Sequence, residues 1–185
     1  MAMPRESAAT PEPQPVRVSP MTVDHLSEVY AIEIASYPRP WPFKCFMDEL
    51  TRNKFARYLV AVDNTGAVRG YAGLWMIHDE GHITNIAVDP EWRRRKIAEQ
   101  ILVHIIDQAR KRELNSMFLE VRRYNVGAQM LYTRYKFEPI SVRERYYADN
   151  EEDAIVLRVE NLGAQEFLDN YTKRRTALGK AMRGE

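Results

Sequence analysis

The stretch that decides the fold is residues 82–98, HITNIAVDPEWRRRKIA. Its first part, His82–Val88, is largely apolar and predicts a strand, which Asp89-Pro90 ends. Over about Arg93–Arg112 the apolar residues recur at helical spacing, so an amphipathic helix is expected. A second apolar run, Met117–Val121, predicts a strand covered on both faces. This strand–helix–strand order implies that the two strands pair in parallel within a mixed sheet.

The flanking segments supply further strands and helices around this unit. In chain order we expect a helix from Thr22 to about Ser36, a loop over Pro38–Pro42, a short helix from Phe43 to Leu50, a hairpin of Tyr58–Asp63 with Val68–His78, a helix over Val126–Lys136, and closing strands over Phe137–Tyr147 and Ala154–Val159. The predicted fold class is α/β (α+β). In such sheets ligands bind at the carboxyl ends of parallel strands, which points to Val88–Ala98 and Glu120–Asn125.

The length of 185 residues fits one globular domain. Residues 1–15 contain four prolines among small and polar residues and are expected to form a flexible arm. Residues 16–160 should form the domain. Residues 161–185 are polar and are expected to be a tail, whose weak apolar stripe is compatible with a helix.

Composition excludes several classes of protein. The 27 basic and 26 acidic residues leave a net charge of +1, which argues against dedicated nucleic-acid binding. A single cysteine, Cys45, excludes an intrachain disulfide and is expected to be a small buried filler. No histidine shows metal-ligand spacing, so no metal is expected. Without an apolar run of ~18 residues or a signal-peptide pattern, we expect a cytoplasmic protein that does not bind membranes.

A basic run, Arg93-Arg94-Arg95-Lys96, opens the central helix directly after a strand. Helix starts offer unpaired backbone N–H groups and a positive dipole end, both of which suit phosphate. Because cations oppose the dipole at this place, the run needs either an anion or solvent. From these residues alone, a phosphate site and a solvated basic patch are equally supported.

The stretch Asn85–Ala98 resembles the acetyl-CoA segment of the GNAT family of N-acetyltransferases, whose loop has the pattern Arg/Gln-x-x-Gly-x-Gly/Ala. Arg93 and Ala98 fit this pattern. Lys96 stands where the family prefers glycine, a residue that relaxes φ and lets the backbone approach a diphosphate. We therefore expect acetyl-CoA binding with an altered loop geometry.

A second stretch narrows the resemblance within the family. Leu119-Glu120-Val121-Arg122 followed by Asn125, Leu131, Tyr132 and Phe137 is similar to the ribosomal-protein-alanine N-acetyltransferases of the RimI type and to archaeal N-terminal acetyltransferases. The resemblance covers roughly Val16–Val159. It implies a mixed, mostly antiparallel central sheet with helices on both faces and a splayed strand pair that binds acetyl-CoA.

The resemblance also implies roles for individual residues. Glu120 would accept a proton and Tyr132 would donate one. Acetyl-CoA would be bound by Ile86, Ala87, Val88, Arg94, Arg95, Lys96, Ile97, Ala98, Glu99 and Asn125. From its position alone, Asn125 could equally cap the following helix, and the two roles are compatible.

Elementary chemistry agrees with these roles. An α-amine has a pKa of about 7.7–8.0 and must lose a proton before it attacks a thioester. Glu120 lies near the end of an apolar strand, where burial is expected to raise its pKa. The alternative is that Glu120 forms a structural ion pair with Arg122 or Arg123. For Tyr132, the alternative is a core tyrosine whose hydroxyl is hydrogen bonded.

The acceptor site is expected near four residues: Glu33, Trp41, Tyr146 and Tyr147. Glu33 falls on the apolar stripe of the first helix and needs a partner, either the ammonium group of a substrate or a structural arginine. The three aromatic residues could wall an extended peptide, although each taken singly could equally be packing.

The predicted reaction is transfer of an acetyl group from acetyl-CoA to the N-terminal α-amine of a protein, with a ribosomal protein N-terminal alanine as the leading candidate. Two alternatives remain open. One is an acetyltransferase that acts on lysine or on a small-molecule amine. The other is a non-catalytic acyl-CoA-binding module, which the replacement of the loop glycine by Lys96 suggests. The sequence makes no prediction of oligomeric state.

Overall fold

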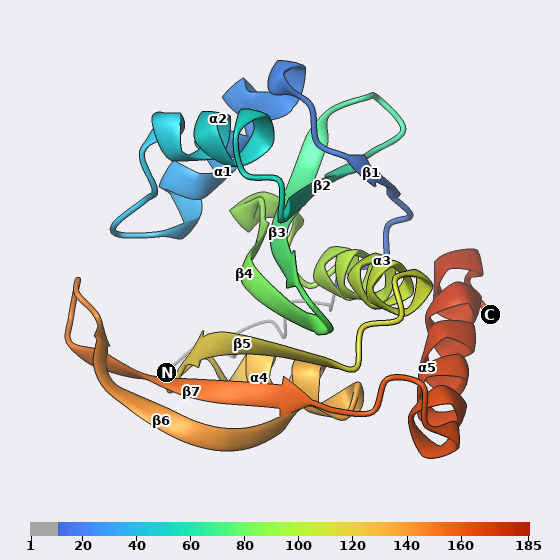
Figure 1. The fold of residues 1–185 in the computed structure, drawn as a ribbon. Helices are drawn as coiled ribbons and strands as arrows, with labels where there is room; N and C mark the ends of the chain where they lie inside the picture. Colours follow the sequence, from blue (N-terminus) through green and yellow to red (C-terminus); the bar gives the residue numbers. More distant parts are fainter. Residues whose placement is uncertain (1–10) are drawn as a thin grey trace, which may run out of the picture.

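A computed structural model describes residues 11–185 and contains one mixed sheet with five α-helices (Figure 1). The elements are β1 (Arg17–Pro20), α1 (Leu26–Ser36), α2 (Phe43–Thr51), β2 (Ala56–Val62), β3 (Val68–Ile77), β4 (Glu80–Val88), α3 (Ile97–Lys111), β5 (Ser116–Arg122), α4 (Val126–Arg134), β6 (Glu138–Tyr147), β7 (Glu152–Val159) and α5 (Gln165–Arg183). Short 3-10 turns at Val23–His25 and Pro90–Trp92 precede α1 and α3. Within residues 11–185, no helix combines the length and hydropathy that a membrane span requires.

The seven strands are arranged in the order β1-β2-β3-β4-β5-β7-β6. The β4–β5 pair is parallel, as the strand–helix–strand pattern predicts, and the other five pairs are antiparallel. The predicted fold, a mixed and mostly antiparallel sheet, is therefore confirmed.

The parallel pair opens into a wedge. β4 is paired with β5 from Glu80 to Ile83, opposite Ser116–Leu119, and the pairing ends there. Beyond this point the two strands diverge: in Figure 1, β4 climbs toward α1 while β5 runs across to the hairpin of β6 and β7. The carboxyl ends of both strands, Thr84–Val88 and Glu120–Arg122, thus border an opening in the sheet.

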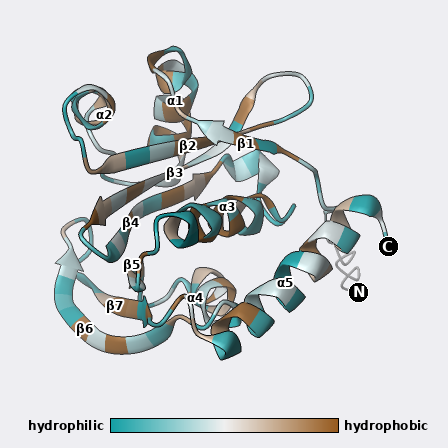
Figure 2. Cartoon of the chain, turned by 45° about the vertical axis from the view of Figure 1, so that its right-hand side comes forward, coloured by the Kyte–Doolittle hydropathy of each residue, from teal (hydrophilic) through white to brown (hydrophobic). Residues whose placement is uncertain are grey.

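Helices cover both faces of the sheet, and each face has its own core. α1 and α2 pack over β2 and β3 around Val29, Phe46 and Tyr71. On the other face α3, α4 and α5 cover a larger core that includes Ile101 and Tyr135. Figure 2 shows apolar residues along β3 and β4, between the two groups of helices.

The carboxyl-terminal segment forms the long helix α5, which packs against α3 (Figure 2). Its apolar residues Phe167, Tyr171 and Leu178 are buried. The Tyr171 hydroxyl donates to the Val103 carbonyl at 3.1 Å and lies 2.8 Å from Asp107 Oδ1. The weak apolar stripe of residues 161–185 is therefore the buried face of a helix.

The structure differs from the expectations for the start of α3 and for Cys45, and it describes only part of the expected N-terminal arm. The central helix begins at Ile97 and not at Arg93, because Arg94 and Lys96 have left-handed φ angles of 65° and 66° that interrupt a helix. Cys45 is exposed on α2 and is not a buried filler. Of the expected arm at residues 1–15, residues 1–10 lie outside the described residues, while Gln14 hydrogen bonds to the domain.

Candidate functional site

A cleft of about 440 Å³ lies where β4 and β5 separate. It brings together residues that sequence reasoning assigned to different tasks and that come from α1, the loop after it, β4, β5, α4 and β6. The predicted site residues that line the cleft are Glu33, Trp41, Ile86, Glu120, Asn125, Tyr132, Tyr146 and Tyr147. Residues 94–99, which are expected to bind a diphosphate, and their expected partners Ala87 and Val88 do not line this cleft.

Glu120 lies at the base of the cleft with two basic partners. Its Oε2 is 2.7 Å from His82 Nε2, and its Oε1 is 3.0 Å from Arg143 Nη1. The imidazole of His82 stacks on Phe118, with 4.3 Å between ring centroids. The carboxylate is nearly buried, with 7% of the side chain exposed, so both contacts act in a partly dehydrated site.

The pKa of Glu120 is lowered, and the expectation of a raised pKa was wrong. Burial acts to raise it, but the hydrogen bond and charge of His82, together with the charge of Arg143, outweigh burial. Glu120 is therefore ionised at neutral pH and is able to accept a proton. The alternative pairing is also wrong, since Arg122 and Arg123 bind other carboxylates.

His82 is a functional candidate that sequence reasoning missed. In the parallel pair it lies opposite Phe118, and Glu120 is two residues further along β5 on the same face. Periodicity alone gives no strand register. The only available signal was a polar residue in an apolar strand next to the predicted site.

Tyr132 extends from α4 into the cleft. Asn125 caps this helix by accepting a hydrogen bond from the Ala128 N–H at 3.2 Å, which leaves the Asn125 side chain at the rim of the cleft. No described residue forms a hydrogen bond with the Tyr132 hydroxyl. Burial, together with the nearby Tyr147, raises the pKa of Tyr132, so its proton is retained at neutral pH.

The loop before α3 has two features that suit an anion. None of the residues in the described range accepts a hydrogen bond from the backbone N–H groups of residues 94–99. The positive end of a 15-residue helix adds a favourable potential there. Lys96 occupies the left-handed conformation that glycine favours, so the loop adopts this conformation with a residue that carries a Cβ atom. These features fit the diphosphate of acetyl-CoA.

Other residues assigned to acetyl-CoA have side chains that point away from solvent. Ala87, Val88 and Ile97 are buried in the core, so they can offer only backbone groups. Glu99 is also buried and accepts hydrogen bonds from Tyr135 at 3.0 Å and Lys96 at 3.1 Å. The Ile86 carbonyl, at the open edge of β4, accepts a hydrogen bond from the Tyr37 hydroxyl at 3.2 Å.

Glu33 is almost completely buried, with 2% of the residue exposed, yet it borders the cleft. Its Oε1 accepts a hydrogen bond from the Trp41 N–H at 2.8 Å, and its Oε2 accepts one from the Tyr71 hydroxyl. Burial raises the pKa of Glu33, and these two hydrogen bonds only partly oppose the increase. No cation from the described part of the chain lies within ion-pair distance, so the arginine expected as an alternative is not found.

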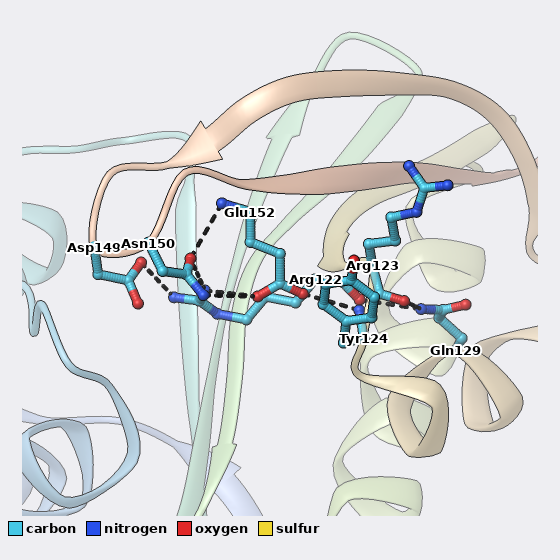
Figure 3. A network of polar contacts seen from close by, with 7 residues as sticks. All are labelled: Arg122, Arg123, Tyr124, Gln129, Asp149, Asn150 and Glu152. Atoms are coloured by element: carbon cyan, nitrogen blue, oxygen red, sulfur yellow. Dashed lines mark hydrogen bonds and ion pairs between the residues drawn. The ribbon is translucent and has the colours of Figure 1, made fainter.

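A network around Arg122 fixes the hairpin between β6 and β7 (Figure 3). The Arg122 guanidinium binds Asp149 at 2.8 Å and Glu152 at 3.0 Å, and it lies 4.0 Å from the ring centroid of Tyr147. Glu152 also accepts a hydrogen bond from the Tyr124 N–H at 2.9 Å. The network therefore holds the two tyrosines of the hairpin, Tyr146 and Tyr147, at the wall of the cleft.

Among residues 11–185, no group of three or more His, Cys, Asp or Glu side chains is arranged to hold a metal ion.

Comparison with known proteins agrees with this geometry. The family model described as "Acetyltransferase (GNAT) family" matches residues 26–137. A Bacillus subtilis protein assigned as a ribosomal protein bS18-alanine N-acetyltransferase is 36% identical over 139 residues, covering 75% of this chain and 91% of the relative. The ribosomal protein bS18-alanine N-acetyltransferase of Escherichia coli is 33% identical over 143 residues, covering 76% of this chain and 94% of the relative.

Solved structures show the same fold. The crystal structure of the Escherichia coli ribosomal-protein-S18-alanine N-acetyltransferase superposes with a TM-score of 0.73, covering 79% of this chain and 94% of that one. Arabidopsis thaliana NAA60 in complex with acetyl-CoA has a TM-score of 0.69 at 15% identity, covering 79% of this chain and 98% of that one, a likeness of fold alone. With its fold, its splayed strands and these relatives, the chain belongs to the acetyltransferase (GNAT) family.

Proposed function

We propose that this protein transfers the acetyl group of acetyl-CoA to the N-terminal α-amine of a protein, and that the acceptor is the N-terminal alanine of a ribosomal protein. The relatives named for this activity support the acceptor, since they align over more than 90% of their own length. Action on a ribosomal protein would place the enzyme in the cytoplasm.

One observation carries the proposal: a single cleft contains an ionised carboxylate, a protonated phenol and a buried carboxylate that has no counter-ion among residues 11–185. These groups are Glu120, Tyr132 and Glu33. The first two suit the two proton transfers of an acetyl transfer. The third suits recognition of a cationic amine, because a buried carboxylate gains most from a partner of opposite charge.

When bound, acetyl-CoA supplies the thioester carbonyl that the amine attacks. Glu120 accepts the proton that the amine loses, either directly or through a water molecule. His82 holds the Glu120 carboxylate in place through its 2.7 Å contact. Arg143 stabilises the same carboxylate from the other side.

Tyr132 donates the second proton, to the departing sulfur. A thiol of the cysteine type has a pKa of about 8.5. Because burial raises the pKa of Tyr132 above that of an ordinary phenol, Tyr132 keeps its proton until negative charge develops on the sulfur, and the transfer runs against this difference in pKa. Because the hydroxyl has no partner among residues 11–185, its proton is available to a ligand in the cleft. The N–H groups of residues 94–99 bind the diphosphate and so fix the distance from this loop to the thioester.

The acceptor is tested with matched peptides. One peptide begins with a free alanine and contains no lysine. A second has a blocked N-terminus and one internal lysine, and a third has both amines free. Steady-state rates should be high for the first and third peptides and near background for the second. Equal turnover of the second peptide would contradict action on an α-amine.

The ribosomal acceptor is tested in cells. Mass spectrometry of ribosomal proteins from cells with and without this chain should show one protein that loses an N-terminal acetyl group. Complementation with the Glu120→Gln variant should fail to restore this group. Unchanged N-terminal acetylation of the ribosomal proteins would show that the acceptor is not a ribosomal protein. The peptide assay would then still show which type of amine is acetylated.

A further inference from the structure

A buried glutamine on α3 ties the segment before β1 to the diphosphate loop. Gln100 is 8% exposed. Its Oε1 accepts a hydrogen bond from the Val16 N–H at 3.1 Å, and its Nε2 donates to the Gln14 carbonyl at 2.8 Å. The Gln14 N–H in turn donates to the Arg95 carbonyl at 3.1 Å. The side-chain amide thus pairs with the backbone of residues 14–16 as a neighbouring strand would.

The carbonyl that receives this contact belongs to the centre of a strained loop. Arg94 and Lys96, on either side of Arg95, both have left-handed φ angles, at 65° and 66°. This conformation is unfavourable for residues with a Cβ atom, and it persists only where surrounding contacts select it. The Gln14–Arg95 hydrogen bond lies between the two strained residues and is such a contact.

We propose that residues 14–16, locked by Gln100, act as a brace that holds the N–H groups of residues 94–99 in the arrangement that binds the diphosphate of acetyl-CoA. Neither Gln14 nor Gln100 lines the cleft of Glu120 and Tyr132, so both are positioning residues and not catalytic ones. This inference rests on the proposed binding of acetyl-CoA, and it assigns to this segment a function that a flexible arm does not have.

The sequence of the brace suits its task. Pro13 and Pro15 flank Gln14, and each fixes its own φ near −65°. A segment that is already extended loses less conformational entropy when it is ordered than an ordinary chain does. Because less entropy is lost, the three described hydrogen bonds of residues 14–16 are enough to hold the brace in place.

The first experiment compares two truncations. The variant lacking residues 1–10 keeps every described contact of the brace, whereas the variant lacking residues 1–15 loses Gln14. We expect the longer truncation to raise the Kd for CoA and the KM for acetyl-CoA about tenfold, as the loss of two or three hydrogen bonds implies. Its kcat should change less than twofold. The shorter truncation should behave as the full chain.

A second pair of variants tests the glutamine without shortening the chain. Gln100→Leu removes the hydrogen bonds of the side-chain amide to Val16 and Gln14, together with a longer one of 3.5 Å to the Lys96 carbonyl. Gln108→Leu is the control on the same helix, because no described residue forms a hydrogen bond with the Gln108 side-chain amide. Trypsin supplies a readout on the free protein, because the loop contains Arg93, Arg94, Arg95 and Lys96. Cleavage in this loop should be faster in Gln100→Leu, and equal to wild type in Gln108→Leu.

Coupling to Lys96 separates a positioning role from a general loss of stability. Glycine adopts a left-handed φ without strain, so the brace should matter less in a Lys96→Gly background. There we expect Gln100→Leu to raise the Kd for CoA about threefold instead of tenfold. A purely structural role would give equal effects in both backgrounds, and that result would overturn the proposal.

The failure of this inference is distinct from failure of the proposed function. If the full chain binds CoA and the braceless variants bind it equally well, the brace is rejected. If the full chain does not bind CoA, the proposed function is rejected, and unchanged trypsin cleavage in Gln100→Leu would reject the brace as well.

Discussion

His82 on β4 and Glu120 on β5 are joined by a hydrogen bond of 2.7 Å between Nε2 and Oε2, at the point where the two strands separate. The contact places an imidazole against the carboxylate that is proposed to accept the proton of the amine. It also explains why a carboxyl group with 7% of its side chain exposed has a lowered pKa. The strand pairing that forms the wedge thus also sets the ionisation of Glu120.

Replacement of His82 by phenylalanine should move the acid limb of the pH–rate profile to higher pH. Phenylalanine keeps the stacking on Phe118 but removes the hydrogen bond and charge of His82 that lower the pKa of Glu120, so that pKa rises, with Arg143 alone still opposing burial. Glu120 is then protonated, and inactive, over a wider acidic range. The measurement is kcat/KM against pH, with His104→Gln on the exposed side of α3 as control. An unshifted acid limb in His82→Phe would show that the imidazole of His82 does not influence the pKa of Glu120.

The two proposed proton-transfer residues should give different kinetic signatures. Glu120→Gln should slow the reaction most at low pH and recover partly as pH rises, because the α-amine then loses its proton unaided. Tyr132→Phe should lower kcat by about 10²-fold or more while the Kd for CoA changes little. Stopped-flow assays and equilibrium titration give both quantities. Wild-type rates in either variant would remove that residue from the mechanism.

The fold could be predicted from the sequence because its signals are local. The apolar runs at 82–88 and 117–121 and the amphipathic helix between them each reveal an element. The crossover rule then predicts that the two strands, which form the wedge, are parallel. The start of α3 was misplaced because a basic run can be helical by composition. Two left-handed residues, which local propensity disfavours, exclude it from the helix.

The site was only partly predictable because its contacts join distant segments. His82 and Glu120 are 38 residues apart and meet through strand register. Arg122 meets Asp149, 27 residues later, through the hairpin of β6 and β7. Periodicity reports which face a residue occupies but not which residue lies opposite. The direction of the pKa shift at Glu120 was wrong for this reason, since burial was foreseeable and the basic partners were not.

The left-handed conformation of Lys96 predicts an unusual order of stabilities. Lys96→Ala keeps the strain of a Cβ atom at φ 66°, whereas Lys96→Gly removes it. We expect the glycine variant to be more stable than the alanine variant by ~1 kcal/mol, measured by urea unfolding. At Ala98, inside α3, the order should reverse, and Ala98→Gly should destabilise by about 0.5–1 kcal/mol. Equal stability of the two Lys96 variants would show that residue 96 does not keep its left-handed φ angle in solution.

Arg122 should matter for the acceptor peptide and not for acetyl-CoA. Arg122→Met removes the contacts to Asp149 and Glu152 and so releases the hairpin that presents Tyr147 to the cleft. We expect a rise of about tenfold in the KM for the peptide, with the Kd for CoA nearly unchanged. Arg123→Met is the matched control, because Arg123 also pairs with a carboxylate of the hairpin, Asp153, but does not line the cleft.

Acid should have the same effect on the hairpin as the Arg122 variant. The hydrogen bond from Arg122 lowers the pKa of Asp149, and the hydrogen bond from the Tyr124 N–H, together with Arg122, lowers that of Glu152. A lowered folded-state pKa contributes stability above the ordinary carboxyl value, and this stability is lost as pH falls through the folded value. In wild type, trypsin cleavage after Arg145 should therefore increase at acidic pH when measured after correction for protease activity. Arg122→Met should be cleaved rapidly throughout.

Glu33 is placed where function and stability oppose each other. Its raised pKa means that the stability contributed by the neutral carboxyl is present at acidic pH and is lost as pH rises through the raised value. Glu33→Gln keeps a hydrogen-bond acceptor for the Trp41 N–H and has no charge to bury. The variant should therefore be more stable than wild type at neutral pH, with a difference in Tm that shrinks toward pH 4. It should also raise the KM for an amino-terminal peptide at least tenfold, because a charge-assisted hydrogen bond to the ammonium is lost. A variant that gains stability and keeps its KM would show that Glu33 serves only the core around Tyr71.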